Sequence, residues 1–126
     1  MPTDGELAIL RVLWDQGPCT VRQVHEALQQ ERRTVYTTVL KLLQIMAEKG
    51  LVTRDETAKA HVYRAVPSRD ATQKSLVGDL LDKAFSGSAS RLVMQALSSR
   101  RASPEELAEI RRLLDGLEGE PHGDAR

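Results

Sequence analysis

A chain of 126 residues is as long as one domain, or one small domain with an appendage, and is too short for two full catalytic domains. Its 18 Lys and Arg residues balance 18 Asp and Glu residues, so the formal net charge is zero and the chain as a whole has no basic coat for nucleic acid. Aromatic residues make up 3% of the sequence and apolar residues 40%, which favours helices and disfavours a β-sandwich.

The sequence carries no signal for export or membrane insertion. The first residues lack the basic stretch and apolar core of a signal peptide, and no apolar run exceeds four residues. The single cysteine, Cys19, can form neither an internal disulfide nor a multi-thiolate metal site, and we expect it to be buried as a small apolar residue. We therefore expect a cytoplasmic protein that has no cofactor or metal and does not bind membranes directly.

Two amphipathic helices are predicted at the start of the chain. Thr3 with Glu6, and Thr20 with Gln23, have the spacing of a capping box, in which the first side chain accepts a backbone hydrogen bond and the second bonds back. Apolar residues recur at helical intervals after each pair, and a Gly-Pro pair at positions 17 and 18 ends the first helix.

A third helix and a β-hairpin are predicted next. Gly50 suits the C-terminal cap of the helix, where a left-handed residue is favoured. Residues 51–56 and 60–65 favour β-structure, and the second run alternates, so we expect two strands joined by a turn at residues 57–59. The apolar stripe that predicts the helix consists of Val35, Val39, Leu42, Leu43 and Met46.

Three further helices are predicted in the C-terminal half. Ser68 can cap a fourth helix, a Ser-Gly-Ser sequence at residues 86–88 separates it from a fifth, and residues 103–106 begin a sixth with serine at the N-cap, proline at N1 and glutamate at N3. The tail from Gly119 onward is expected to be disordered.

Three helices followed by a hairpin, all before residue 67, have the element order of a winged helix-turn-helix, whose third helix enters the DNA major groove. Residues 32–64 hold seven basic and three acidic residues, whereas residues 102–126 hold three basic and seven acidic ones, so the zero net charge conceals two segments of opposite sign. We interpret the chain as mainly α with a small β-hairpin wing. A DNA-binding domain is expected at residues 1–66, a helical dimerisation region at 67–118 and a disordered tail at 119–126.

Nine side chains around the third helix and the hairpin are candidates for DNA contact. On the helix, hydroxyl groups can meet phosphates or base edges, a leucine can meet a thymine methyl group, and lysine and glutamine can reach base edges. Two arginines before the helix can clamp phosphates, and the hairpin turn can reach the neighbouring backbone. The alternative is a polar face and a charge run that are only solvated, with the histidine as a cross-strand filler. The candidates are Arg32, Arg33, Thr37, Thr38, Leu40, Lys41, Gln44, Lys59 and His61.

The last three helices are rich in leucine but too short to bury much core alone, so we expect a second copy of the chain to complete them. The alternative is a monomer in which they fold back on the winged domain. The candidate dimerisation residues are Leu76, Leu80, Leu92, Val93, Leu97, Leu107, Ile110 and Leu114.

No pattern in the sequence indicates an enzyme. His25 and Glu26 begin like the zinc motif HExxH, but Gln29 stands where the second histidine is needed, so we expect His25 to be an exposed helix residue. A P-loop, a dinucleotide fingerprint, a nucleophile elbow and an apolar carboxylate pair are all absent. The remaining alternative is a winged-helix module that binds protein instead of DNA.

Several short segments of the chain match, in order, the pattern of one known family: residues 6–7, 12–14 with 17–18, 36–40, 48–52, 61–64 and 103–107. Together they resemble the penicillinase-repressor family (BlaI/MecI type), and the resemblance extends over residues 3–118. It implies a homodimeric winged-helix repressor that binds a palindromic operator. It places the operator-reading helix at residues 36–48, the wing around Lys59, and the dimer contacts in the C-terminal helices.

The same resemblance bears on regulation. In family members controlled by a membrane sensor protease, a cut in the dimerisation region inactivates the repressor. The corresponding bond here lies near Gln95-Ala96, although these two residues do not match a diagnostic pair. A copper-responsive branch has a cysteine-rich C-terminal tail, which residues 121–126 do not provide, so copper sensing by that route is not expected.

Overall fold

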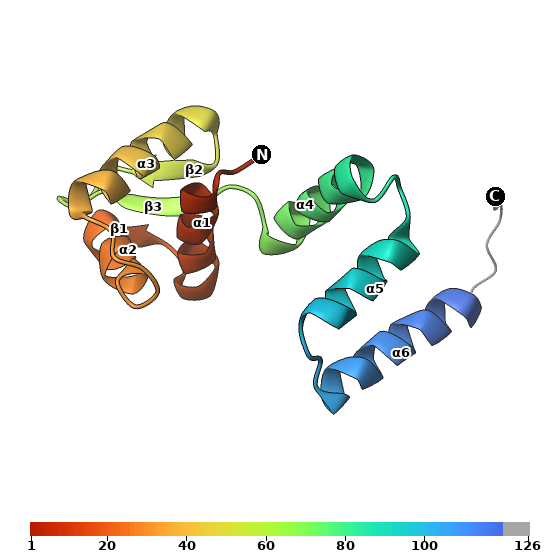
Figure 1. Ribbon diagram of the computed structural model, residues 1–126. Coiled ribbons are helices and arrows are strands. Elements are labelled where there is room, and N and C mark those ends of the chain that lie inside the picture. The colour runs from red at the N-terminus through yellow and green to blue at the C-terminus, as the bar shows by residue number, and fades with distance from the viewer. Residues whose placement is uncertain (120–126) are drawn as a thin grey trace. The chain divides into compact units, whose positions relative to one another are not determined.

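The computed structural model describes residues 1–119 and divides into two compact units, residues 1–79 and the residues from 80 onward (Figure 1). Gly119 belongs to the last helix, so the expected tail does not begin there, and residues 120–126 lie outside the described residues. The elements are α1 (Asp4–Gln16), β1 (Cys19–Thr20), α2 (Val21–Leu28), α3 (Tyr36–Lys49), β2 (Val52–Asp55), β3 (Val62–Ala65), α4 (Arg69–Ala84), α5 (Ala89–Ser99) and α6 (Pro104–Gly119).

The first unit is a winged helix in which α1, α2 and α3 pack on a small antiparallel sheet with the strand order β1-β3-β2. The sequence predicted only the two strands of the hairpin. The third strand, β1, is two residues long, and it pairs with β3 through Cys19 opposite Tyr63 and Thr20 opposite Val62. A strand this short leaves no periodic pattern in a sequence, yet it fixes the start of α2 to the hairpin.

The predicted helix ends of this unit are confirmed. Thr3 with Glu6 and Thr20 with Gln23 both form reciprocal capping boxes. Gly50 closes α3 in the left-handed region with φ 82°, a conformation that a residue with a side chain adopts only at a cost.

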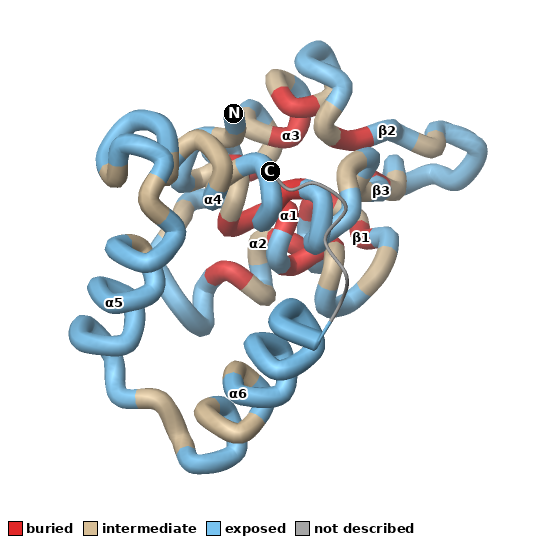
Figure 2. Tube along the Cα trace, turned by 90° about the vertical axis from the view of Figure 1, so that its right-hand side faces the viewer, coloured by how far each residue is buried: buried red, intermediate tan, exposed pale blue. Residues whose placement is uncertain are grey.

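The core of the first unit lies between the three helices and one face of the sheet, and Figure 2 shows its buried residues in α1, α2, α3 and the strands. Tyr63 and Met46 are almost completely buried, and each side chain of this size contributes about 1.5–3 kcal/mol by its burial. Val35 is not part of the core, contrary to the stripe predicted from the sequence. It is the N-cap of α3 with extended backbone angles, so it does not share the helical periodicity and is 65% exposed.

The start of α4 packs on α1 within the first unit. The indole Nε1 of Trp14 donates a hydrogen bond of 3.0 Å to the carbonyl oxygen of Pro67. The guanidinium of Arg69 lies 5.7 Å from the centroid of the Trp14 ring and forms an ion pair with Asp15, while Thr72 is buried beside it. The compact unit that contains the sheet therefore extends to Asp79, into the fourth helix.

The second unit contains the end of α4 with α5 and α6, and none of the residues of α5 or α6 is buried. The predicted start of α6 is confirmed, because Ser103 and Glu106 hydrogen-bond to each other's backbone N–H groups. The break after α4 is also confirmed, with Ser86 and Gly87 at positive φ. No helix among residues 1–119 is both long enough and apolar enough to cross a membrane.

Candidate nucleic-acid interface

The N-terminus of α3 is open, unlike those of the other helices. Serine or threonine side chains cap α1, α2, α4, α5 and α6, but Val35 offers α3 no side-chain hydrogen bond. The first N–H groups of a helix need acceptors, and they carry the positive end of its dipole. The start of α3 is therefore suited to contact with an anionic group such as a phosphate.

The outward face of α3 presents most of the side chains that the sequence indicated. Thr37, Lys41 and Gln44 are exposed at positions that share one helical face, and Thr38 is exposed beside them. Leu40 differs from these, because it is only partly exposed and packs against the core of the unit. Only part of the Leu40 side chain is left for contact with a thymine methyl group.

The turn between α2 and α3 is fixed by His25, which is half-buried and not an exposed helix residue as the sequence suggested. Its Nε2 atom lies 2.7 Å from the carbonyl oxygen of Thr34, and the amide of Gln29 hydrogen-bonds to the same oxygen. Its ring meets Tyr36, the first residue of α3, edge to face with 5.8 Å between centroids. Arg32 and Arg33 are exposed on this fixed turn.

The wing carries Lys59 and His61 exposed between β2 and β3. Asp55 accepts hydrogen bonds from the backbone N–H and the hydroxyl of Thr57, and these bonds lower the pKa of Asp55 below its usual value. Arg54 hydrogen-bonds to Tyr63 and forms an ion pair with Glu56, interactions that raise its pKa. The charge of Arg54 is therefore already paired within the hairpin.

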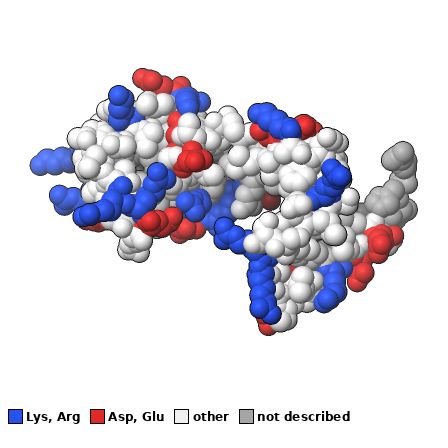
Figure 3. Space-filling view, viewed as in Figure 1, with Lys and Arg blue, Asp and Glu red and all other residues white. Residues whose placement is uncertain are grey.

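A hollow of about 430 Å³ brings together the start of α2, the start of α3 and the wing. Three of the predicted candidates, Leu40, Lys59 and His61, line it together with Tyr36 and Arg22. In Figure 3 basic side chains project at the end of the first unit where Figure 1 places the wing turn and the start of α3. Arg22 was missed in the sequence because it lies in a mixed polar face of α2, away from the basic segment.

The basic residues of the first unit fall into two sets. Five of them form ion pairs with carboxylates: Arg11, Lys49, Arg54, Arg69 and Lys74. The other six form none with any residue in the described part of the chain: Arg22, Arg32, Arg33, Lys41, Lys59 and Arg64. All six lie on α2, on the turn before α3, on α3 or on the wing. The basic side chains of the first unit that form no ion pair within residues 1–119 are therefore concentrated on these elements.

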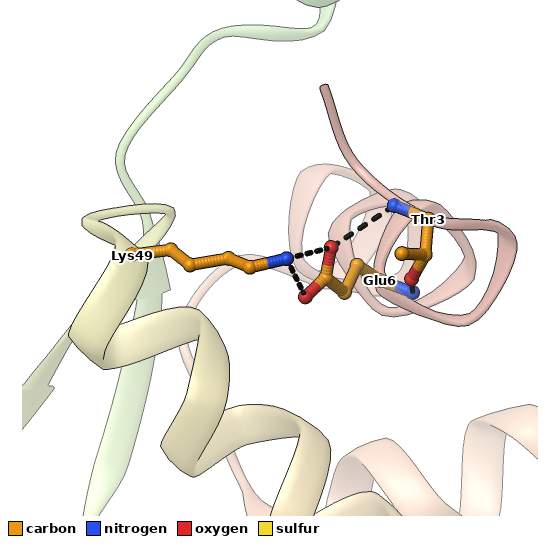
Figure 4. Close-up of polar contacts among 3 residues, drawn as sticks. All are labelled: Thr3, Glu6 and Lys49. Atoms are coloured by element: carbon orange, nitrogen blue, oxygen red, sulfur yellow. Dashed lines mark hydrogen bonds and ion pairs between the residues drawn. The ribbon is translucent and has the colours of Figure 1, made fainter.

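Lys49, which counted toward the basic excess of the segment 32–64, has a structural contact (Figure 4). Its Nζ lies 2.8 Å from Oε2 of Glu6, whose side chain is only 2% exposed, and Oε1 of Glu6 accepts a hydrogen bond from the backbone N–H of Thr3. Burial alone raises the pKa of Glu6, but the bonds from Lys49 and Thr3 outweigh it and lower the pKa below its usual value. This pair joins the ends of α1 and α3 and does not face the hollow.

The candidate dimerisation and cleavage residues have different environments. Leu76 is half-buried in the first unit, where it lines a groove with Leu7 and Trp14. Gln95 and Ala96 are exposed within α5. Of the remaining candidates, Leu92, Leu107 and Ile110 are half-buried, and Leu80, Val93, Leu97 and Leu114 are exposed.

Residues 1–119 contain no cluster of metal-binding side chains. In that range no three His, Cys, Asp or Glu side chains lie close enough to one another to hold a metal ion. Cys19 is buried, as the sequence predicted, and its burial raises the pKa of the thiol.

Comparison with known proteins identifies relatives over almost the whole chain. The family described as "Penicillinase repressor" matches residues 2–116. The chain is 39% identical over 122 residues to the "Transcriptional regulator BlaI" of Mycobacterium tuberculosis, in strains CDC 1551/Oshkosh and H37Rv. That alignment covers 96% of this chain and 87% of each relative.

Two solved structures are also similar to the chain. One is described as "CopR Repressor Structure", with a TM-score of 0.46 and 25% identity, covering 54% of this chain and 99% of that one. The other is Bordetella bronchiseptica BpsR, from a study of the regulation of its DNA binding by 6-hydroxynicotinic acid. It has a TM-score of 0.48 and 18% identity, and the match covers 91% of this chain and 74% of that one.

Proposed function

Because the chain belongs to the penicillinase-repressor family and is homologous to BlaI transcriptional regulators, we propose that it is a cytoplasmic repressor that binds a palindromic operator as a homodimer and catalyses no reaction. The observation that carries this proposal is the distribution of unpaired cations in the first unit. All six lie on the elements that a winged helix presents to DNA, and the nearby α3 terminus is uncapped.

We assign different roles to the two parts of this surface. Thr37, Lys41 and Gln44 on the outward face of α3 read base edges in the major groove, where lysine and glutamine have suitable donors. Arg32 and Arg33 before α3, and Lys59 and His61 on the wing, bind phosphates, and so set the position of the protein without reading sequence. Thr38 and the exposed part of Leu40 contribute contacts at the edge of the helix.

The second unit supports the dimer part of the proposal. Exposed apolar side chains on α5 and α6, including Val93, Leu97 and Leu114, have no core of their own to enter. A second copy of the chain supplies the missing surface, and two-fold symmetry then sets two α3 helices on two half-sites of one operator.

Release from the operator is proposed to follow a cut near Gln95-Ala96 by a membrane sensor protease. Both residues are exposed, but they lie inside α5, so the helix has to open locally before a protease can bind it in extended form. Cutting there separates the proposed dimer contacts up to Val93 from Leu97 and the contacts of α6. Two winged units that are no longer linked then lose the gain in affinity that comes from binding one operator together.

The test is binding to labelled DNA from upstream of the protein's own gene, followed by gel shift at low salt. The wild type is expected to shift this DNA, and Lys41→Ala and Arg33→Ala are expected to weaken the shift about tenfold, as for loss of one charged contact of about 1.4 kcal/mol. Lys74→Ala is a matched control, because Lys74 is exposed but pairs with Asp70 on α4.

The result also decides between DNA and protein as the ligand of the winged unit. No shift at low salt, or a shift that Lys41→Ala and Arg33→Ala leave unchanged, would contradict DNA binding by this surface. It would favour the alternative, a winged-helix module that binds another protein.

A further inference from the structure

We propose that the hollow between α2, α3 and the wing is a binding site for the phosphate backbone of DNA, and that Arg22 is its phosphate-binding residue on α2. The inference rests on the proposed DNA-binding function and adds to it a residue outside the segment 32–64. It also predicts that α2 contacts the DNA strand together with the wing.

The first argument is the chemistry of the hollow. Arg22, Lys59 and His61 contribute basic side chains to its lining, and no Asp or Glu lines it. The other polar side chains in the lining are Thr20, Tyr36 and Tyr63. This lining favours an anionic ligand. A neutral or cationic ligand would remove water from the basic side chains without supplying a compensating negative charge.

The second argument is that Arg22 and the wing are held close by the sheet. Thr20 pairs with Val62 across β1 and β3, so the residue before the strand, His61, lies beside the start of α2. Arg22 is two residues beyond Thr20, in the first turn of a helix whose capping box fixes its direction. The short strand β1 therefore holds the start of α2 beside the wing, where both can contact one ligand.

The third argument concerns the partners of these charges. Arg22 and Lys59 are exposed, and neither forms an ion pair with a carboxylate anywhere in residues 1–119. Arg54 on the same hairpin differs, since Glu56 already neutralises it. No carboxylate of residues 1–119 neutralises Arg22 or Lys59, so both side chains are available to an anionic ligand. An arginine can bind a phosphate with two parallel hydrogen bonds.

The location of the hollow indicates where such a phosphate comes from. Tyr36 and Leu40 belong to α3, so the hollow adjoins the face that carries Thr37 and Lys41. With α3 in the major groove, the strand that borders the groove runs past the start of α2 and the wing. A backbone phosphate is therefore the anion that we assign to the hollow, and a free phosphate compound is the competing source.

The test is the salt dependence of DNA binding, measured by fluorescence anisotropy for operator and random DNA. If Arg22 neutralises one phosphate, Arg22→Ala is expected to reduce the slope of log K against log salt by about one on both DNAs. Arg22→Lys is expected to restore the slope, because it retains the charge. Arg11→Ala is the matched control, since Arg11 is a similarly exposed arginine that pairs with Glu31, and it is expected to leave the slope unchanged.

Each contrary outcome has a distinct meaning. If the wild type binds no DNA, the proposed function fails and the inference fails with it. If the wild type binds but Arg22→Ala keeps the full slope, only the role of Arg22 is overturned. Thermal unfolding of Arg22→Ala identifies a loss of binding caused by misfolding. In that case Arg22→Gln, which removes the charge but keeps a long polar side chain, replaces it, and a full slope for Arg22→Gln overturns the role of Arg22.

A competition experiment separates the two sources of phosphate. Inorganic phosphate and sulfate are added at equal ionic strength to the wild-type complex with DNA. A backbone site predicts that both anions displace DNA equally, through screening alone. Displacement by phosphate at concentrations where sulfate has no effect, and its loss in Arg22→Ala, would identify a site for a small phosphate compound and overturn the assignment to DNA.

Discussion

The two units of the chain differ in where their apolar side chains lie. In the first unit, fourteen apolar residues of the helices and the sheet form a buried cluster. In the second unit, no residue of α5 or α6 is buried, and residues such as Met94 and Leu113 are more than 60% exposed. The comparison teaches that the first unit has a buried apolar core of its own, whereas α5 and α6 leave apolar side chains exposed, as the proposed dimer contact requires.

The largest effect on stability is expected from a substitution that leaves a cavity in the core of the first unit. Leu43 is completely buried, so Leu43→Ala is expected to lower the free energy of unfolding by about 2–5 kcal/mol. Urea denaturation followed by circular dichroism measures the loss. Leu117, which is 47% exposed on α6, provides the comparison, and an equal loss for Leu117→Ala in dilute solution would contradict the view that only the first unit has a core.

The next largest effect is expected from a charge in the proposed dimer contact. Leu114→Asp is expected to convert the protein from dimer to monomer at tens of micromolar, and to weaken operator binding about ten- to a hundredfold through lost avidity. Sedimentation equilibrium measures the first change and anisotropy the second. Val66→Asp is the control, because Val66 is equally exposed but lies in the first unit. A wild type that sediments as a monomer would remove the dimer.

A smaller effect distinguishes the side chains of the first unit that are proposed to read bases from those that are proposed to bind phosphates. Gln44→Ala is expected to cost about 1 kcal/mol on the operator and little on random DNA, because a base contact is lost. Lys59→Ala is expected to weaken both DNAs alike, because phosphates carry no sequence information. Anisotropy titrations on the two DNAs check this, and equal effects of both variants on both DNAs would refute the division of roles.

The smallest effect concerns the pair between Glu6 and Lys49. The pKa of Glu6 is lowered in the folded chain, so its ionised form stabilises the fold above its usual value of 4.5, and this contribution is lost as the pH falls through the folded pKa. Lys49→Ala is expected to cost about 1 kcal/mol at neutral pH, since Lys49 is half exposed, and to begin acid unfolding at a higher pH.

Urea denaturation between pH 3 and pH 7 measures this pH dependence, and the difference between wild type and Lys49→Ala should shrink toward the acid end. Lys74→Ala, which removes an exposed pair within α4, is the control and is expected to leave the acid midpoint unchanged. A constant difference across the pH range would mean that the charge of Glu6 is not involved.

Features that depend on a few neighbouring residues could be predicted from the sequence. The capping boxes at Thr3, Thr20 and Ser103 and the left-handed Gly50 are interactions within four residues of chain, and all are present. The hairpin follows from alternation within a short segment. The family could also be predicted, because short segments that resemble it occur in the expected order along the chain. The family match over residues 2–116 confirms this prediction.

Features that depend on residues far apart in the chain could not be predicted. Glu6 and Lys49 are separated by 43 positions, so nothing near either one reveals the pair. The hydrogen bond between Trp14 and Pro67 spans 53 positions. The exposure of Val35 was missed for a different reason, since one turn of irregular backbone before a helix shifts a residue off an otherwise regular stripe.

The candidate site shows the same limit. The outward face of α3 could be derived from helical periodicity alone, because the opposite side chains are apolar. The proposed contribution of Arg22 could not, because it depends on the pairing of β1 with β3, two strands separated in the sequence by α2, α3 and β2. The sequence also indicated that His25 is only an exposed polar residue of a helix. In the structure it is half-buried and contacts the turn that bears Arg32 and Arg33.

The buried thiol of Cys19 has a practical consequence. It is the single cysteine of the chain, it lies in β1 opposite Tyr63, and burial raises its pKa, so little reactive thiolate is available while β1 stays paired. Its rate of alkylation by a small thiol reagent therefore measures how often this edge of the sheet opens. The alkylation rate of Cys19, measured with and without DNA, therefore reports the local unfolding of the winged unit.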